Sequence, residues 1–353
     1  MIICRTPFRI SFFGGGTDYP AWYRAHGGAV LATTIDKYCY LTCRYLPPFF
    51  EHRYRIVYRK IETCKTVEEI SHPAVRAVLD FMKVERGIEL HTDNDLPARS
   101  GMGSSSAFTV GLLNTIHALH GSMATKRQLA LDAVHLEQDV LKETVGSQDQ
   151  VMAAFGGLRH IRFPAGGDIS VNPVILPPER LEEFKSHLML FFTGINRTAS
   201  DVARSYVEDI EARRRQLRLM KDLVEESLTI LTGGRDLQAF GQMLHEAWQA
   251  KKSLSAMVSN SEVDGLYDRA RQAGALGGKL TGAGGGGFLL LFVPPAKQHD
   301  VRQALDSLIH VPFDFEPHGS DIIFYDPEID YRDAEKVRAR QSNITFKDLP
   351  HAA

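Results

Sequence analysis

The sequence predicts an α+β protein with a substantial antiparallel sheet. Segments with the composition of strands and segments with helical periodicity are mixed in both halves of the chain, which is typical of this class. The chain has 353 residues, and a single hydrophobic core rarely grows beyond roughly 250–300 residues. We therefore expect about two domains, and a proline-rich stretch near residues 173–178 is the predicted boundary between them.

The N-terminal half is predicted to be rich in strands. Its strand segments alternate apolar and polar positions or concentrate β-branched and aromatic side chains. They span residues 2–13, 29–45, 53–60, 87–92 and 157–163. Helices are expected near residues 73–86, from the end of the segment 101–106 to about residue 120, and over residues 125–143. In the last of these, Leu129, Ala133, Leu136 and Val140 share one side at helical spacing.

The C-terminal half is predicted to combine long helices with short buried strands. The helices span residues 199–232, 236–255, 261–273 and 296–309. The strands span residues 188–193, the two ends of 276–293 around a glycine turn, and 320–325, which is expected to close the second domain. These limits give an N-terminal domain at residues 1–175, a C-terminal domain at 176–335 and a peripheral polar tail at 336–353.

Composition and charge exclude several classes of partner. The net charge is -2, whereas a nucleic-acid-binding domain is usually strongly basic, so we expect no nucleic-acid partner. The four cysteines all lie in the first 64 residues and form no zinc-binding set, which indicates reduced thiols. No apolar run approaches the roughly 18 residues of a membrane span. The apolar N-terminal segment is interrupted by Arg5 and Arg9, whereas a signal peptide has an uninterrupted apolar stretch. We expect a cytoplasmic protein without a membrane partner.

A segment rich in glycine and serine leads directly into the predicted helix that ends near residue 120. It consists of Gly101, Met102, Gly103, Ser104, Ser105 and Ser106. Glycines let a backbone approach a ligand closely, and the free N–H groups and positive end of a helix favour an anion. Serine hydroxyl groups can donate to phosphate or ligate Mg²⁺. We interpret the segment as a phosphate-binding loop, with a serine-capped helix after a flexible loop as the alternative. It is not a P-loop, because no lysine follows the glycines at the required spacing.

A second glycine-rich segment, residues 279–287, stands between two predicted strands. Gly282, Gly284 and Gly287 match the letters of a dinucleotide-binding motif, but that motif opens a helix and here a strand follows. Two interpretations stay open. The segment is either a tight turn between strands or a backbone loop that packs beside a bound phosphate or substrate.

Two further segments place acidic side chains where phosphoryl transfer needs them. Asp149 can accept a hydroxyl proton, and Glu137 on the predicted helix 125–143 can hold Mg²⁺. The alternative is a helix-capping aspartate with a surface glutamate. Residues 5–19 form a predicted strand that ends in glycines, followed by Thr17 and Asp18, which can offer hydroxyl and carboxylate contacts to a polyol. A strand followed by an Asx-type turn explains that segment equally well.

Together and in this order, these segments resemble the GHMP kinases, a family that includes galactokinase, homoserine kinase, mevalonate kinase and phosphomevalonate kinase. Residues 5–19 resemble the N-terminal motif of the family, residues 97–107 its phosphate-binding motif and residues 279–287 its C-terminal glycine motif. The resemblance covers about residues 1–330. It implies a two-lobed fold, with an ATP-binding N-terminal domain like ribosomal protein S5 domain 2 and a C-terminal ferredoxin-like α/β sandwich. It also implies ATP and Mg²⁺ as cofactors.

The resemblance implies a role for each matching position. The loop at 101–106 would bind the ATP phosphates, and Ser105 and Glu137 would bind Mg²⁺. Asp149 would be the catalytic base, and Arg9 would polarise the attacking hydroxyl group or steady that aspartate. Substrate contacts are expected from Gly16, Thr17, Asp18, Arg197, Thr198, Gly284 and Gly285.

Within the family, several segments resemble the branch that phosphorylates the anomeric hydroxyl group of D-glycero-D-manno-heptose 7-phosphate for GDP-heptose and bacterial surface polysaccharide biosynthesis. Gly15 and Gly16 stand where galactokinases have Glu-His, which argues against galactose. L-Fucose kinases are similar in the same segments, so a fucose kinase or another sugar 1-kinase is the alternative. A catalytically silent sensor of sugar and ATP is the alternative from another class. The expected partners are a small sugar phosphate and ATP, and the sequence leaves a homodimer open.

Overall fold

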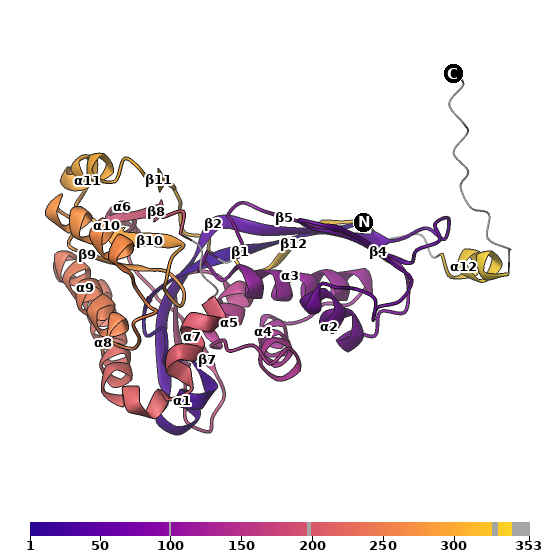
Figure 1. The fold of residues 1–353 in the computed structure, drawn as a ribbon, viewed down its shortest axis with the longest axis horizontal. Coiled ribbons are helices and arrows are strands. Elements are labelled where there is room, and N and C mark those ends of the chain that lie inside the picture. The colour runs from indigo at the N-terminus through magenta and orange to yellow at the C-terminus, as the bar shows by residue number, and fades with distance from the viewer. Residues whose placement is uncertain (99, 196–198, 327–330, 341–353) are drawn as a thin grey trace, which may run out of the picture.

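The computed structural model describes residues 1–98, 100–195, 199–326 and 331–340 (Figure 1). Within these ranges the strands form two sheets. The strand order of the larger sheet is β12-β1-β2-β5-β3-β4, and in addition β6 pairs with β2 and β7 pairs with β6. The strand order of the smaller sheet is β11-β8-β10-β9. The mixed α+β architecture with two sheets, predicted from the sequence, is confirmed.

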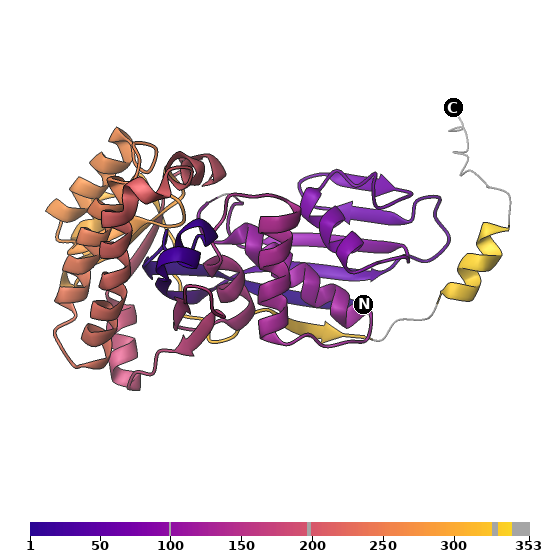
Figure 2. The same cartoon turned by 90° about the horizontal axis from the view of Figure 1, so that it is seen from below.

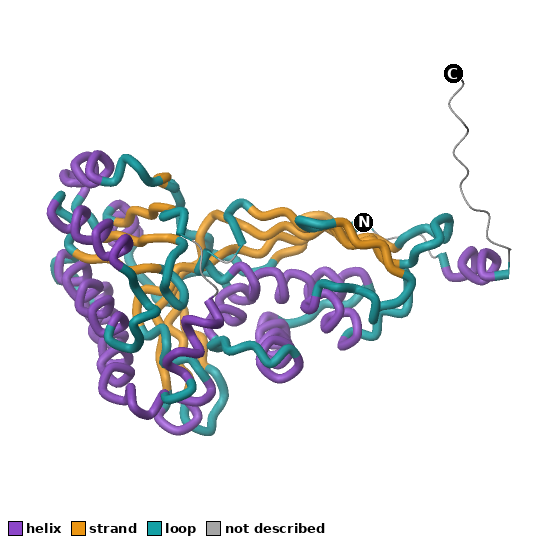
Figure 3. The backbone as a smooth tube through the Cα atoms, in the orientation of Figure 1, coloured by secondary structure: helices purple, strands orange, loops and turns teal. Residues whose placement is uncertain are grey.

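The larger sheet is built on two long antiparallel strands, β1 (Ile2–Phe13) and β2 (Gly28–Tyr45). Its other strands are β3 (Tyr54–Val57), β4 (Ile61–Cys64), β5 (Ile88–Asn94), β6 (Arg159–Phe163), β7 (Ser170–Pro173) and β12 (Asp321–Tyr325). The β3–β5 pair is parallel, and the other pairs are antiparallel. Figure 3 shows these strands as one layer with helices on one side of it.

The helices of the N-terminal half cover that side of the larger sheet (Figure 1). They are α2 (Pro73–Phe81), α3 (Ser104–Leu119), α4 (Lys126–His135), the π-helical turn η1 (Leu136–Val140) and α5 (Gln148–Phe155), and α1 (Pro20–His26) joins β1 to β2. The central helix α3 contacts β1, β2, α4 and α5 and is buried along most of its length. Its first turn is therefore held rigidly at the edge of the core.

The smaller sheet consists of β8 (Leu188–Phe192), β9 (Gly277–Leu280), β10 (Phe288–Phe292) and β11 (Ile309–His310). The accompanying helices are α6 (Pro178–Ser186), α7 (Ala199–Val207), η2 (Ile210–Arg213), α8 (Arg214–Thr232), α9 (Gln238–Lys252), α10 (Ser261–Gln272), η3 (Pro295–Lys297) and α11 (Gln298–Ala304). Helix α9 packs on β9, and α8 lies along α9 and also contacts β1 and β2. Figure 2 shows these helices stacked at one end of the molecule, next to the ends of the long strands.

Aromatic side chains extend the larger of two hydrophobic core clusters across both halves of the chain. The ring of Phe12 on β1 lies 5.4 Å from that of Phe184 on α6 and 5.8 Å from that of Phe240 on α9. Phe184 and Phe240 themselves meet at 4.8 Å. Such edge-to-face contacts bury large apolar surfaces. They hold the C-terminal helices against the end of β1, so residues from both halves meet at a fixed place.

Several predicted elements differ from the structure. The strand at 320–325 does not close the C-terminal domain, because β12 pairs with β1 in the larger sheet. The helix expected over 125–143 ends at His135 and continues only as the π-helical turn. The helix expected over 199–232 is divided into α7, η2 and α8, and the one expected over 296–309 is the turn η3 and the short α11. Helix α12 (Arg332–Ala339) begins before the expected tail.

The four cysteines are free and buried, as the sequence predicted. Within the part of the chain that the structure describes, no helix has both the length and the apolar character that a bilayer crossing requires.

Candidate active site

The predicted phosphate-binding loop ends in the first turn of α3. Gly103 is the residue before the helix and has φ 76°, in the left-handed region that glycine adopts without strain. The next three serines form the first turn, whose backbone N–H groups have no acceptor within the helix. Because α3 is held in the core, these N–H groups and the positive end of the helix point outward from a fixed position. This arrangement suits an anion.

The second glycine-rich segment packs directly on this loop. A Cβ atom on Gly282 would lie 2.6 Å from the Cα atom of Gly101, and one on Gly101 would lie 2.6 Å from the carbonyl oxygen of Thr281. Both distances are too short for any side chain. The segment is therefore a turn between β9 and β10 that packs as a backbone wall on the predicted phosphate loop. Its place beside a bound phosphate or substrate stays a prediction.

Arg9 and Asp149 form a bidentate ion pair beside the same loop. Arg9 lies on β1 and is only 4% exposed, and Asp149 is in the first turn of α5. The guanidinium Nε and Nη2 atoms donate to the two carboxylate oxygens over 2.7 and 2.6 Å, and Nη1 donates to the Gly101 carbonyl oxygen over 2.7 Å. Such a fork fixes the orientation of the carboxylate. The Asp149 side chain stays 26% exposed, so its remaining lone pairs can meet a ligand.

Glu137 is buried at the start of the π-helical turn. Its Oε2 atom accepts hydrogen bonds from the Ser106 hydroxyl group, over 2.8 Å, and from the Gln150 amide. Its Oε1 atom is buried and has no hydrogen-bond partner. Burial raises the pKa of this carboxyl group to about 7. Ser105, the predicted second ligand, is exposed in the first turn of α3, and Ser106 is the serine that contacts Glu137. The role of Ser105 stays a prediction.

The donor set around Glu137 fits Mg²⁺. The ion is usually held by one or two carboxylates together with substrate phosphates, and it retains several waters. Glu137 provides one carboxylate with an unpaired oxygen at the start of the phosphate loop helix. Among the described residues there is no group of three or more His, Cys, Asp or Glu side chains that could hold a metal by itself. A cation here would depend on a phosphate ligand.

Asp18 connects the turn after β1 to the start of α5. It is almost fully buried, and its carboxylate accepts the backbone N–H groups of Gly16, over 2.9 Å, and of Gln148, over 3.3 Å. Its backbone oxygen accepts the N–H group of Ser147 over 2.9 Å. Burial raises the pKa of the Asp18 carboxyl group. This side chain therefore holds Gly16 beside the helix that carries Asp149.

The other described residues predicted to contact the substrate make contacts within the protein. Thr17 is fully buried, and its hydroxyl group bonds to the backbone of Gly14 and Ala29, so it supports the turn instead of facing a ligand. Gly285 donates its N–H group to the Val258 carbonyl oxygen, and Gly284 packs against the same residue. Arg197 and Thr198 lie outside the described residues.

Two buried lysines next to this cluster were not predicted. Lys251 on α9 donates a hydrogen bond to the Gly282 carbonyl oxygen, and Lys279 on β9 donates one to the Phe12 carbonyl oxygen over 3.0 Å. Burial lowers the pKa of Lys251 to about 7 and that of Lys279 well below its ordinary value. For Lys251 the sequence holds a usable signal, since it lies four residues after Ala247 and three after Trp248 on the buried face of α9.

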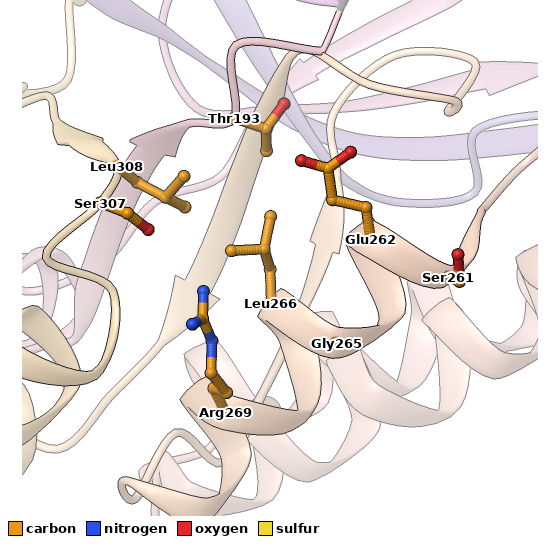
Figure 4. Close-up of a pocket in the computed structure, with 8 residues that line it drawn as sticks. All are labelled: Thr193, Ser261, Glu262, Gly265, Leu266, Arg269, Ser307 and Leu308. Atoms are coloured by element: carbon orange, nitrogen blue, oxygen red, sulfur yellow. The ribbon is translucent and has the colours of Figure 1, made fainter.

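A separate cavity of about 530 Å³ lies beside α10 in the C-terminal half (Figure 4). It is lined by Thr193, Ser261, Glu262, Gly265, Leu266, Arg269, Ser307 and Leu308. None of the predicted site residues lines it, so it is distinct from the cluster around Arg9 and Asp149.

Two family descriptions match the chain. "GHMP kinases N terminal domain" matches residues 67–157, and "GHMP kinases C terminal" matches residues 219–310. The chain is 29% identical over 318 residues to D-glycero-alpha-D-manno-heptose 7-phosphate kinase of Campylobacter jejuni, covering 85% of this chain and 92% of that protein. It is 26% identical over 329 residues to L-fucokinase/L-fucose-1-P guanylyltransferase of Bacteroides fragilis, covering 81% of this chain but 34% of that protein.

Solved structures show the same fold. A D-glycero-D-manno-heptose 1-phosphate kinase from Bacteroides thetaiotaomicron superposes with a TM-score of 0.75 at 24% identity, covering 91% of this chain and 98% of that one. The chain therefore belongs to the GHMP kinases, phosphotransferases that use ATP to phosphorylate an alcohol group.

Proposed function

We propose that the chain transfers the γ-phosphoryl group of ATP to the anomeric C1 hydroxyl group of D-glycero-D-manno-heptose 7-phosphate, which gives the 1,7-bisphosphate for GDP-heptose synthesis. The observation that carries the proposed chemistry is the Arg9–Asp149 pair beside the loop at 101–106. The proposed acceptor is supported by the likeness to the Campylobacter jejuni heptose 7-phosphate kinase, which extends over 92% of that protein.

In this mechanism Asp149 accepts the proton of the C1 hydroxyl group. The oxygen attacks the γ-phosphorus, the bond to the bridging β–γ oxygen breaks, and ADP leaves. The protein contributes mainly position and charge to such transfers. Arg9 keeps the carboxylate of Asp149 in one orientation through its two hydrogen bonds, and its third bond ties the pair to Gly101. The N–H groups at the start of α3 hold the ATP phosphates.

Glu137 would hold Mg²⁺ through its unpaired Oε1 atom, together with the hydroxyl group of Ser105 or Ser106. When bound, this cation neutralises charge on the β- and γ-phosphate oxygens. Asp18 supports the acceptor side. Its carboxylate fixes the Gly16 amide and the start of α5, so the sugar would be held at a constant distance from Asp149.

The test is a coupled assay of ADP release with D-glycero-D-manno-heptose 7-phosphate, the unphosphorylated heptose, L-fucose, galactose and mannose. We expect turnover with the heptose 7-phosphate to exceed that with the other sugars. Turnover with L-fucose alone would establish the second candidate, which is supported by the likeness to the Bacteroides fragilis L-fucokinase over 81% of this chain. No turnover with any sugar would favour a sensor.

Asp149→Asn tests the proposed base in the same assay. Asparagine keeps an acceptor for Arg9 but cannot take the proton, so we expect kcat to fall by about 10²–10⁴-fold. Binding of a nonhydrolysable MgATP analogue, measured by calorimetry, should change little. Asp139→Asn is the matched control, because Asp139 is an exposed carboxylate that pairs with His135. A kcat near that of the wild type in Asp149→Asn would contradict the assignment.

A further inference from the structure

Helix α9 places a lysine where the rest of its inner face is apolar. Lys251 is 4% exposed and shares the buried face with Leu244, Ala247 and Trp248. Its ammonium group donates to the carbonyl oxygen of Gly282, in the segment that packs on Gly101. The lysine thus reaches from the C-terminal half of the chain to the wall of the phosphate loop.

The ammonium group has more donors than the described residues use. A lysine ammonium carries three N–H donors, and the described structure gives this one a single acceptor, the Gly282 carbonyl oxygen. Burying a charge without partners is unfavourable, and burial accordingly lowers the pKa of Lys251 to about 7. An apolar side chain would fill the position without this cost. The two remaining donors are available to an anion.

The neighbouring cations differ from Lys251 in their partners and in the part of the site they meet. Arg9 on β1 is occupied by the two oxygens of Asp149 on α5 and by the Gly101 carbonyl oxygen. Lys279 on β9 donates to the carbonyl oxygen of Phe12, in the backbone of β1. Lys251 instead meets the loop that touches the phosphate loop. Among the described residues, Lys251 is the cation of this cluster that meets the loop without a carboxylate partner.

We propose that Lys251 is a further catalytic residue of this kinase, and that its ammonium group contacts the transferred γ-phosphoryl group from the side of the C-terminal domain. The assignment rests on the proposed phosphoryl transfer. Since the positive charge of Arg9 is balanced by Asp149, Lys251 supplies a positive charge at the loop that no described carboxylate neutralises by an ion pair. Its bond to Gly282 holds the ammonium group at the place where the two glycine-rich segments meet.

Three variants test this role. Lys251→Met keeps the length of the side chain and removes the charge and the donors, Lys251→Arg keeps both, and Lys252→Met is the control. Lys252 is the next residue, is partly exposed and pairs with Asp264 on the surface. We expect Lys251→Met to lower kcat by about 10²-fold, while KM for both substrates stays within about threefold. We expect Lys251→Arg to keep most of the activity and Lys252→Met to keep all of it. Circular dichroism and the thermal midpoint show whether each variant folds.

The pH dependence gives a second readout. The charged groups that face Lys251 are Arg9 on β1, Asp18 after β1, Asp149 on α5 and Lys279 on β9. If protonated Lys251 binds the phosphoryl group, kcat/KM for MgATP falls as the pH rises through about 7, where the lysine of the free enzyme loses its proton, and Lys251→Arg moves this fall to higher pH. A kcat of Lys251→Met within about threefold of the wild type, or an alkaline limb that Lys251→Arg leaves in place, would overturn the proposal. A loss limited to KM for phosphorylated sugars would also overturn it, because it would indicate a contact with the distal phosphate.

The two proposals fail in different ways. If the heptose 7-phosphate is not the acceptor, the wild type is active on another sugar, and the variants are compared on that sugar. Slow hydrolysis of MgATP without any sugar tests Lys251 with water as the acceptor. An unchanged kcat of Lys251→Met on the sugar that the wild type uses contradicts only the assignment of Lys251.

Discussion

Glu137→Gln measures how much the buried carboxyl group of the proposed metal site destabilises the folded protein when it ionises. In the folded protein the Glu137 carboxyl group is buried next to Ser106 and Gln150, and burial raises its pKa from 4.5 to about 7. Glutamine keeps an oxygen that can accept both hydrogen bonds, and it cannot ionise. The substitution therefore removes the titration while it preserves most of the packing.

The size of the effect follows from the two pKa values. Because the folded-state pKa is raised, the folded protein holds a proton where the unfolded chain has lost it. The resulting stability is fully present below pH 4.5 and is lost as the pH rises through about 7. At about 1.4 kcal/mol for each pH unit, ionised Glu137 costs about 3 kcal/mol at pH 8. Mg²⁺ bound at Oε1 would offset this cost.

The assay is urea unfolding of the wild type and Glu137→Gln at pH 5 and pH 8 with EDTA present. We expect the free energy of unfolding to decline between the two pH values by about 2.5 kcal/mol more in the wild type than in the variant, because part of the cost is already present at pH 5. All other titrating groups are common to both proteins, so the difference isolates Glu137. Glu226→Gln, an exposed glutamate on α8, should behave as the wild type. An equal decline in wild type and Glu137→Gln would refute the reasoning.

Two further predictions concern the phosphate loop. Ser106→Ala should weaken Mg²⁺-dependent turnover more than Ser105→Ala, because the Ser106 hydroxyl group is the one that contacts the buried carboxylate. A titration of kcat with Mg²⁺ measures this difference. The reverse order would support Ser105 as the ligand. Gly282→Ala should raise KM for ATP by about tenfold or more, since its Cβ atom would lie 2.6 Å from the Gly101 Cα atom. Gly121→Ala is its control, with φ 70° instead of 65° and open space around the new Cβ atom, and equal effects of the two would contradict the packing argument.

Local patterns predicted most of the fold and failed where long-range contacts decide. The long strands β1 and β2 follow from their alternation and β-branched residues. The strand β12 has the same kind of local signal, but its partner is β1, some three hundred residues earlier. Its place in the larger sheet depends on the return of residues 311–320, where Glu316 bonds to Thr34. The helix α5 has only eight residues, too few for a clear period.

The candidate site shows the same division. The phosphate loop at 101–106 could be predicted from its glycine and serine residues, because the proposed chemistry lies within one segment. The choice between Ser105 and Ser106 depends on which side of α3 each hydroxyl group faces. Two adjacent serines in the sequence do not indicate which of them faces Glu137. Arg9 and Asp149 are 140 residues apart, and their pairing was suggested by the family resemblance alone. Lys251 was not predicted, although a charged residue on the apolar face of a helix indicates a buried charge with a possible functional role.

The most direct test of the central claim is phosphorus NMR of the product formed from MgATP and D-glycero-D-manno-heptose 7-phosphate. We predict a second phosphomonoester signal that grows together with ADP, equals the signal of the 7-phosphate at completion and is coupled to the anomeric proton. ADP formed without a phosphate on C1, or a C1 phosphate that forms on L-fucose and not on the heptose, would contradict the account.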